Sequence, residues 1–386
     1  MIPRIAFFLP ALYGGGVEKI VLDLTKSFYG RGTLVDLVLA KASGEYFNEI
    51  PYGIRVIDLN VKRVHLSVFP LVKYLKKEQP PYLLSALPHC DIAALIAKKL
   101  VNIETKIIVC QHVNLSKEYK NTNRLLLKIL YPLLLRKIYP WSDLVIAVSQ
   151  GMAHDASRWF GISEQDIHVI HNPIDILNIV WKSHEPINHK WFRPGQPPVI
   201  LAMGRLTKQK NFSQLINAFN IVRKKSSCHL MILGEGECRH NLEKLVKNLG
   251  LSEDILLPGF VRNPYPYLTQ ASVFVLSSLW ESFSVVLVEA LALGVPVIST
   301  KCDYGPSEIL EDGKYGTMVP VNNVTLMAQA ILESLNKPRS SHGRVRARLF
   351  DLETIADQYQ AILESGKYWR HHSSKSNLSS DYLKRK

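Results

Sequence analysis

The chain has 386 residues, of which 47% are hydrophobic, and it carries a formal charge of +14 at pH 7, which favours a globular protein of two domains with an anionic partner. Its five cysteines are scattered and never spaced as CxxC, so they indicate neither a disulfide framework nor a zinc site, and we expect a cytoplasmic protein. Basic residues are not interleaved with aromatic ones as in single-strand nucleic-acid binders, so a phosphate-rich ligand or an anionic membrane surface is favoured over nucleic acid.

The first half of the chain alternates short apolar runs with helical patterns. The first helix opens near Val17, and apolar residues recur on one of its faces at Val21, Leu24 and Phe28. This alternation predicts a parallel sheet built from strand-helix-strand units, in an N-terminal domain over residues 1–181. Its strands are expected at RIAFFL, VDLVLA, IRVIDL, YLLSAL, KIIVCQH, LVIAVS and IHVIHN.

A leucine-rich and basic segment, residues 123–141, comes nearest to a membrane span. Lys128, Pro132 and Arg136 interrupt it, so it falls short of the roughly 18 apolar residues that a spanning helix needs. A basic, leucine-rich helix suits a membrane interface, which would make the protein peripheral on the cytoplasmic face of a membrane. A helix packed on the side of a domain explains the same pattern, and the sequence leaves both interpretations open.

A polar, proline-bearing stretch over residues 182–198 lacks periodicity and is expected to be a linker. A second series of strands and helices follows it and predicts a C-terminal domain over residues 199–350. The fold class is therefore α/β, with two Rossmann-like, doubly wound parallel sheets facing a cleft outside the carboxyl ends of their strands. A last helix over residues 351–365 is expected to return to the N-terminal domain, and the basic tail over residues 366–386 to be disordered. The C-terminal strands are expected at VILAMG, HLMILG, ILLPGF, VFVLSS, PVIST and TMVPV.

Two of these strand ends carry groups that suit a diphosphate. The strand VILAMG runs into Arg205 and then Lys210 where a helix begins, and an Arg and a Lys beside a helix start are a usual means of holding phosphates. Solvated loop charges are the alternative interpretation. In ILGEGE, Gly234 and Gly236 permit a close backbone approach, although a simple turn explains them as well.

A third strand end leads into WESFSVVLVEALALGVPVIST, residues 280–300. Glu289 interrupts an apolar helical run that starts around Ser284, and Glu281 precedes this run. A buried carboxylate needs a compensating partner, and it would repel a phosphate but accept hydrogen bonds from hydroxyls. A ligand with phosphates in its middle and hydroxyl-rich groups at both ends, a nucleotide-sugar, satisfies both the cations and the carboxylates. The alternative for Glu289 is a structural ion pair with a buried Arg or Lys.

Taken together, these segments resemble the GT-B glycosyltransferases of the large retaining family 4, whose motif is two glutamates eight positions apart. Glu281 and Glu289 have this spacing, and ALALGVPVIST follows them. The resemblance reaches to about Ser365. It rests further on GGGVEKIVLDL, HNPID, GRLTKQKNF, PGF and DYGPSEILEDGKYG.

The resemblance implies roles for individual residues of the donor site. Arg205 and Lys210 match the pair that binds the diphosphate, Glu289 matches the glutamate on the nucleotide ribose, and Glu281 matches the glutamate near the donor sugar and is a catalytic candidate. The remaining donor-binding candidates are Gly204 and Gly234, the backbone amides around Ser284 and Val285, and Phe260 and Val261 beside the base.

In the N-terminal domain, the resemblance implies that Gly14, Gly15 and Gly16 form a loop facing the phosphates and the acceptor. His112 matches a histidine near the reacting carbon and is the second catalytic candidate; a histidine that merely caps a strand end is the alternative. The family often has glycine at the position of Ser282, and glycine or proline at that of Ser284, so the space beside the donor sugar is narrower here.

Family membership implies transfer with retention at the anomeric carbon by front-face attack, and no residue stands out as a nucleophile with an adjacent base. A DxD segment is missing from the strand ends, so we expect neither a metal ion nor a cofactor, with a UDP-sugar as donor and a glycan or lipid-linked acceptor. A sugar-nucleotide epimerase would need acid and base residues that we do not identify. A dinucleotide-dependent oxidoreductase would need GxGxxG where GGGVEK stands, and a nucleic-acid-binding protein would leave the glutamates unexplained.

Overall fold

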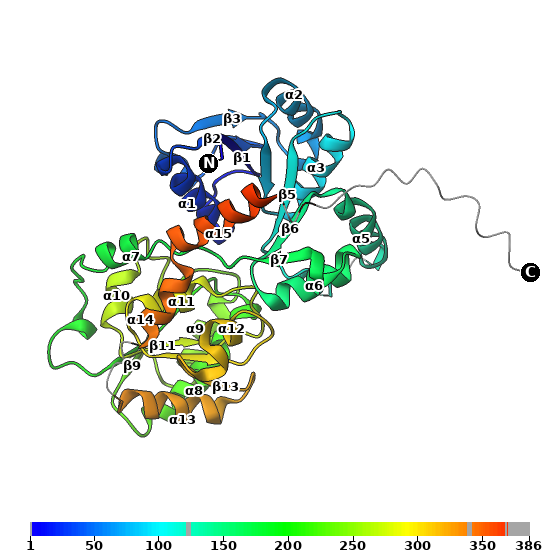
Figure 1. Ribbon diagram of the computed structural model, residues 1–386. Helices are drawn as coiled ribbons and strands as arrows, with labels where there is room; N and C mark the ends of the chain where they lie inside the picture. Colours follow the sequence, from blue (N-terminus) through cyan, green and yellow to red (C-terminus); the bar gives the residue numbers. More distant parts are fainter. Residues whose placement is uncertain (1, 121–124, 338–341, 367–368, 370–386) are drawn as a thin grey trace, which may run out of the picture.

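A computed structural model describes residues 2–120, 125–337, 342–366 and 369, and it shows two α/β domains that are each built on one parallel sheet (Figure 1). The predicted fold class of two doubly wound domains is confirmed.

The N-terminal domain has a seven-stranded sheet in the order β3-β2-β1-β4-β5-β6-β7. Neighbouring strands pair in parallel throughout, because helical crossovers connect them. Its strands are β1 (Arg4–Leu9), β2 (Leu34–Leu39), β3 (Arg55–Asp58), β4 (Tyr82–Ser85), β5 (Lys106–Gln111), β6 (Leu144–Ala147) and β7 (Ile167–Val169). Its helices are α1 (Gly16–Gly30), α2 (Val68–Glu78), α3 (Pro88–Lys99), α4 (Leu115–Lys120), α5 (Leu125–Ile138) and α6 (Gln150–Phe160).

The C-terminal domain repeats this plan with a six-stranded sheet in the order β10-β9-β8-β11-β12-β13. Its strands are β8 (Val199–Met203), β9 (His229–Leu233), β10 (Ile255–Gly259), β11 (Val273–Leu276), β12 (Val297–Thr300) and β13 (Thr317–Val319). Its helices are α7 (Ile176–Lys182), α8 (Phe212–Arg223), α9 (Arg239–Asn248), α10 (Tyr265–Gln270), α11 (Val285–Ala292), α12 (Pro306–Leu310), α13 (Val324–Leu335) and α14 (His342–Ala347). The strand order reverses between β1 and β4 and again between β8 and β11, so the loops after these strands are where a doubly wound fold binds its ligand.

The last described helix, α15 (Leu352–Ser365), leaves the C-terminal domain and packs against α1 of the N-terminal domain (Figure 1). Its buried face joins the same apolar cluster as β1 and α1. The contact is also polar, because Arg31, directly after α1, forms ion pairs of 2.7 Å with Glu353 and with Asp357. The two domains are therefore joined by two chain crossings, one between β7 and α7, which packs on α10 and α11, and one before α15.

The predicted linker and tail are only partly free of contacts. Trp191, near the end of residues 182–198, is buried, and its ring stacks on His229 of β9 with 4.2 Å between ring centroids. Most of residues 366–386 lie outside the described residues; of the exceptions, Trp369 stacks on Tyr82 of β4.

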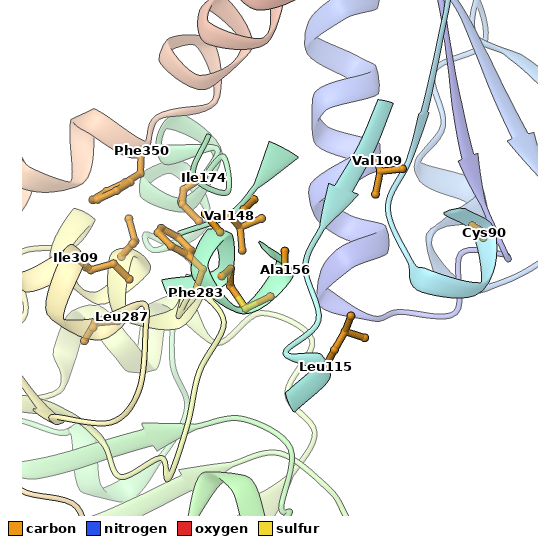
Figure 2. Packing of buried hydrophobic residues seen from close by; sticks show 14 of the residues in the cluster. Cys90, Val109, Leu115, Val148, Ala156, Ile174, Phe283, Leu287, Ile309 and Phe350 are labelled. Atoms are coloured by element: carbon orange, nitrogen blue, oxygen red, sulfur yellow. The ribbon is translucent and has the colours of Figure 1, made fainter. Parts of the chain in front are cut away.

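An apolar cluster continues across the boundary between the domains (Figure 2). Phe283, from the segment before α11, points towards Val148 and Ile174 of the N-terminal domain, and Ile309 of α12 lies beside it (Figure 2). The Phe283 ring also meets those of His171 and Phe350, at 5.5 and 5.4 Å between ring centroids. The segment that carries Glu281 is thus packed against both domains.

The leucine-rich segment forms α5 over its described part, whereas residues 123 and 124 lie outside the described residues. Leu135 and Ile138 are buried, whereas Leu130, Leu133 and Leu134 are between 43% and 58% exposed. The spacing of the exposed residues places them on one outward face. None of the described helices has the length and hydrophobicity of a membrane span.

Candidate active site between the domains

A first cavity of about 440 Å³ opens between the two domains at the carboxyl ends of β1, β8, β9 and β10. The N-terminal domain contributes Tyr13, Gly14 and Glu45 to its walls. The C-terminal domain contributes Met203, Gly204, Arg205, Leu233, Gly234, Glu235, Phe260, Val261, Pro264, Val286 and Glu289. The cavity therefore brings together seven of the candidates from the sequence: Gly14, Gly204, Arg205, Gly234, Phe260, Val261 and Glu289.

Two glycines shape the floor of this cavity. A Cβ atom on Gly234 would lie 2.0 Å from the carbonyl oxygen of Gly204, which no side chain could tolerate. Both residues also have positive φ angles, 139° at Gly234 and 150° at Gly204, a region that favours glycine. The ends of β8 and β9 can approach each other only because both positions are glycine.

Arg205 lies at the junction of the first cavity with a second one, and it lines both. Its side chain is exposed and, within the described part of the chain, makes no ion pair or hydrogen bond. A planar guanidinium without a protein partner can bind two phosphate oxygens at once. The geometry thus favours a ligand-binding role over the alternative of a plain solvated charge.

Lys210 and Glu281 form an ion pair of 2.6 Å beneath the wall that Gly204 contributes. Both side chains are largely buried, at 16% and 6% exposure. Glu281 Oε1 accepts the bond from Lys210 and a second one, of 2.6 Å, from the Ser278 hydroxyl. Among the described residues Oε2 has no partner, and two of the three N–H groups of the Lys210 ammonium are unused. Each partner therefore keeps capacity for a ligand, although neither of them lines either cavity.

Glu289 lies in the middle of α11 and faces the first cavity. Its Oε1 accepts a hydrogen bond of 3.0 Å from the Tyr265 hydroxyl, and among the described residues it makes no ion pair. Burial raises the pKa of Glu289 to about 7, against the smaller, opposite effect of the Tyr265 bond. The expected partner is thus a tyrosine and not a cation, so the structural ion pair proposed as the alternative for Glu289 is not formed.

Two helices begin at the cleft without a side-chain cap. Gly15 precedes α1, Ser284 precedes α11, and neither side chain caps its helix. The free N–H groups of both first turns are therefore available to an anion. Gly14 and Val286 line the first cavity, and Val17 lines the second. Neither cavity is lined by the predicted residues next to them in the sequence, which are Gly15, Gly16, Ser284 and Val285.

The second cavity, of about 550 Å³, contains His112 in its wall. His112 is 8% exposed, and burial lowers its pKa to about 4 although the neighbouring Asn172 favours the protonated form. The imidazole is therefore neutral near pH 7, and its buried Nδ1 has no hydrogen-bond partner among the described residues. Such a ring can exchange a hydrogen bond with a bound hydroxyl.

The second cavity also contains residues that the sequence reasoning missed, among them His89, Asn114 and Lys117. Asn114 Oδ1 accepts from the backbone of Lys117 at 3.0 Å, which leaves its buried Nδ2 without a partner in the described structure. His89 follows β4 and Asn114 follows β5, so the strand-end rule that found Arg205 could have found both. The other missed wall residues are Leu87, Pro88, Val113, Tyr131, Gln209 and Trp280.

Across residues 2–120, 125–337, 342–366 and 369, no group of three or more His, Cys, Asp or Glu side chains is arranged to hold a metal ion. The positive groups at the cleft are instead Arg205, Lys210 and Lys117.

Comparison with known proteins finds two family models on the chain. The model described as glycosyl transferases group 1 matches residues 183–348, and the model described as glycosyltransferase family 4 matches residues 14–176. The two matches follow the two sheets of the structure, since the first covers β8 to β13 and the second covers β2 to β7.

Among curated proteins, the chain is similar to a 4-alpha-N-acetylgalactosaminyltransferase of Campylobacter jejuni, named for the acceptor N-acetylgalactosamine-N,N'-diacetylbacillosaminyl-diphospho-undecaprenol. The two are 35% identical over 376 residues, which is 92% of this chain and 97% of the relative. The lipopolysaccharide core biosynthesis glycosyltransferase LpsE of Rhizobium meliloti is 26% identical, with coverage of 91% and 96%. Among solved structures, Anabaena Alr3699/HepE in complex with UDP matches at a TM-score of 0.76 and 20% identity, over 94% of this chain and all of the other.

Proposed function

The chain belongs to the group 1 glycosyltransferases, which share the GT-B fold, and on this premise we propose that it transfers a sugar from a UDP-sugar to a lipid-linked glycan acceptor with retention of the anomeric configuration. One observation carries the proposal. The unpartnered guanidinium of Arg205 lies where a cavity containing Glu289 meets a cavity containing His112. This order matches that of the donor, with ribose, diphosphate and sugar in succession.

The donor would occupy the first cavity with its base beside Phe260 and Val261 and its ribose hydroxyls donating to Glu289. Its diphosphate would lie between Arg205 and the spare N–H groups of Lys210, close to the free amides of α11. Residues 280–284, which we call the donor loop, would hold the sugar, because Glu281 Oε2 can accept from a sugar hydroxyl. The complex of Alr3699/HepE with UDP supports UDP as the carrier.

In the reaction, the bond between the anomeric carbon and the phosphate oxygen breaks while the acceptor hydroxyl bonds to the same face of that carbon. The acceptor proton passes to the departing phosphate, so no protein nucleophile is required. Arg205, Lys210 and the helix amides would stabilise the charge that develops on the leaving diphosphate. Neutral His112 would position a hydroxyl of the transferred sugar.

The acceptor would enter the second cavity from the side of α5, because Tyr131 on the inner face of α5 lines it. Its charged lining residues, Lys117 and Arg205, are both cationic; Lys117 forms an ion pair of 2.8 Å with Asp303, but no carboxylate lines the cavity itself within the described part of the chain. This charge suits an acceptor that carries phosphate close to its sugar. The name of the Campylobacter relative, whose acceptor is a diphospho-undecaprenol, supports this class and makes UDP-N-acetylgalactosamine the first donor to test.

The test is release of UDP from a panel of UDP-sugars in the presence and absence of undecaprenyl-diphosphate-linked oligosaccharide. We expect acceptor-dependent release, and a product whose new linkage has the donor's anomeric configuration by NMR. Release without any product, or an inverted linkage, would contradict the proposal. Conversion of the nucleotide-sugar without UDP release would instead favour an epimerase.

We expect turnover to survive EDTA, because protein cations and helix amides would supply the positive charge that a metal ion supplies elsewhere. The measurement is the initial rate after treatment with excess EDTA, followed by re-addition of Mg²⁺ or Mn²⁺. A rate that falls at least tenfold with EDTA and returns with the metal would show that a metal ion is needed.

Replacing Glu289 with Gln should affect UDP binding and the stability of the fold in opposite directions. Its folded-state pKa of about 7 lies above the ordinary 4.5, so the folded protein keeps a proton that the unfolded chain has lost. The stability that this proton contributes to the folded state is complete below about pH 4.5, and it is lost as the pH rises through 7. Glu289→Gln should therefore raise the unfolding free energy at pH 8, by at most about 3 kcal/mol, and change it little at pH 4.5.

The same substitution should weaken UDP binding at pH 8, because a neutral amide accepts the ribose hydroxyls less strongly than a carboxylate. Between pH 6 and pH 8, calorimetry should show that the affinity of the wild type for UDP rises severalfold more than the affinity of the variant. The change in the variant reports the titration of UDP alone. Parallel pH profiles, or a variant less stable than wild type at pH 8, would contradict this role.

We propose that α5 docks the enzyme on an anionic membrane. Leu130, Leu133 and Leu134 form its exposed outward face, which ends in exposed Arg136 and Lys137. Leucines enter the acyl boundary and basic residues attract anionic headgroups, so this face matches a membrane interface. Tyr131, on the more buried side of α5, lines the acceptor cavity, so docking would bring a lipid-linked sugar to the site.

Changing Leu133 and Leu134 together to Ser should lower binding to vesicles containing phosphatidylglycerol at least tenfold, because each leucine contributes about 1.5 to 3 kcal/mol when buried. Flotation measures the binding. The matched control changes Leu177 and Trp181, an exposed apolar pair on α7, to Ser. Equal losses in the two variants, or no wild-type binding, would contradict docking through α5.

A further inference from the structure

The N-terminus of α6 holds two segments of the C-terminal domain at the same time. The Ser149 hydroxyl donates to the carbonyl oxygen of Ser282 in the donor loop at 2.8 Å. The backbone amides of Gln150 and Gly151 donate to the two carboxylate oxygens of Glu308, at 3.0 and 3.1 Å. Three consecutive residues of the N-terminal domain thus reach both the donor loop and α12.

Glu308 completes the N-terminus of α6. The amide of Met152 donates to the Ser149 hydroxyl and that of Ala153 to the Ser149 carbonyl oxygen, so the amides of Gln150 and Gly151 depend on Glu308. A carboxylate is the preferred partner at this end of a helix. Burial alone would raise the pKa of Glu308, but bonds from His171 and from the two amides outweigh it, and the pKa lies below its ordinary value.

We call the contact of Ser149, Gln150 and Gly151 with Ser282 and Glu308 the joint. On the C-terminal side of the joint, the residues before Glu308 are bonded to the donor loop. The amide of Glu281 donates to the carbonyl oxygen of Asp303 at 3.3 Å. A Cβ atom on Gly305 would lie 2.9 Å from the Cα of Phe283, so the two backbones are in close contact. A shift of α12 away from α6 would therefore move the loop that carries Glu281.

Gly151 shows how closely the domains approach at this joint. A Cβ atom on Gly151 would lie 1.9 Å from Cδ1 of the Tyr304 ring and 2.8 Å from its Cβ. Tyr304 has a φ of 69°, in the left-handed region, so its backbone has little freedom to adjust. Alanine at position 151 would thus suit the helix itself but would obstruct the contact between the domains.

We propose that Glu308 is a positioning residue for sugar transfer: by binding the N-terminus of α6 it holds the domains and the donor loop in the arrangement in which Glu281 meets the donor sugar. This inference rests on the donor role proposed for Glu281. The nucleoside diphosphate would itself be held by Arg205, Lys210 and Glu289, none of which belongs to the joint.

The test compares Glu308→Gln and Gly151→Ala with the control Glu311→Gln, a nearby carboxylate whose described ion pairs, to Lys314 and Arg346, stay within the C-terminal domain. We expect the two joint variants to lower kcat with UDP-N-acetylgalactosamine at least fivefold, to change the Kd for UDP less than threefold, and to lower the melting temperature by no more than about 4 °C. Hydrogen exchange should become faster in peptides covering 149–153 and 278–286. The control should match wild type in every measurement.

The proposal is overturned if both joint variants turn over like Glu311→Gln, or if they lose UDP affinity and melting temperature in proportion to turnover, as a purely structural role would require. Unchanged exchange in 278–286 in both variants would also overturn it. This exchange measurement needs no turnover, so it tests the joint even if UDP-N-acetylgalactosamine is not the donor. Failure of the donor assignment would appear separately, as an absence of turnover in the wild type.

Discussion

Glu281→Gln is expected to lower turnover about a hundredfold or more while the Kd for UDP stays within about threefold of wild type, because the carboxylate acts on charge and hydroxyls at the reacting sugar and not on the nucleotide. The amide can still accept the hydrogen bonds of Lys210 and Ser278, so the loop should keep its conformation. Initial rates with saturating donor, together with calorimetry, separate the two quantities.

The control for this variant is Glu253→Gln, which removes an exposed carboxylate from the same domain. A loss of UDP affinity as large as the loss of turnover would place Glu281 at the nucleotide instead. Turnover equal to that of the control would remove it from the mechanism.

Lys210→Met is expected to damage both stability and binding. Removing one partner of a buried ion pair leaves the Glu281 carboxylate uncompensated, at a cost of about 3 kcal/mol in the free energy of unfolding. It also removes a charge-assisted bond to the diphosphate, worth about 2 kcal/mol, or roughly thirtyfold in the Kd for UDP. Thermal denaturation and calorimetry measure the two effects.

The double variant Lys210→Met, Glu281→Gln distinguishes these two roles. It should recover most of the lost stability, because no buried charge is left alone, but it should not recover affinity or turnover. Additive losses of stability would show that the two side chains do not interact, and recovered affinity would show that Lys210 does not bind the diphosphate.

The fold could be predicted from the sequence because its determinants are local. Apolar runs such as Arg4–Leu9 and Val199–Met203 are strands buried in parallel sheets. The helices between the strands favour a parallel, doubly wound arrangement. The strand-end rule also placed Arg205 and Gly234 correctly in the wall of the first cavity, since the ends of parallel strands meet at one edge whatever the loop conformations are.

Contacts between separate elements, whether within one domain or between the two domains, could not be predicted in this way. Tyr265 is 24 positions from Glu289, and neither apolar periodicity nor charge marks it as the partner of a carboxylate. Glu45 comes from a short 3-10 helix after β2, and it reaches the first cavity only because the domains face each other. The bond between Glu308 and Gln150 likewise depends on the relative position of two separately folded units.

The central claim is that one diphosphate bridges the two cavities at Arg205, with the ribose on Glu289 and the sugar on the donor loop. A crystal structure of the protein with UDP tests it most directly. The account predicts phosphate oxygens within hydrogen-bond distance of Arg205 and Lys210, and ribose hydroxyls within the same reach of the Glu289 carboxylate. UDP bound with its ribose away from Glu289, or with its phosphates away from both cations, would contradict the account.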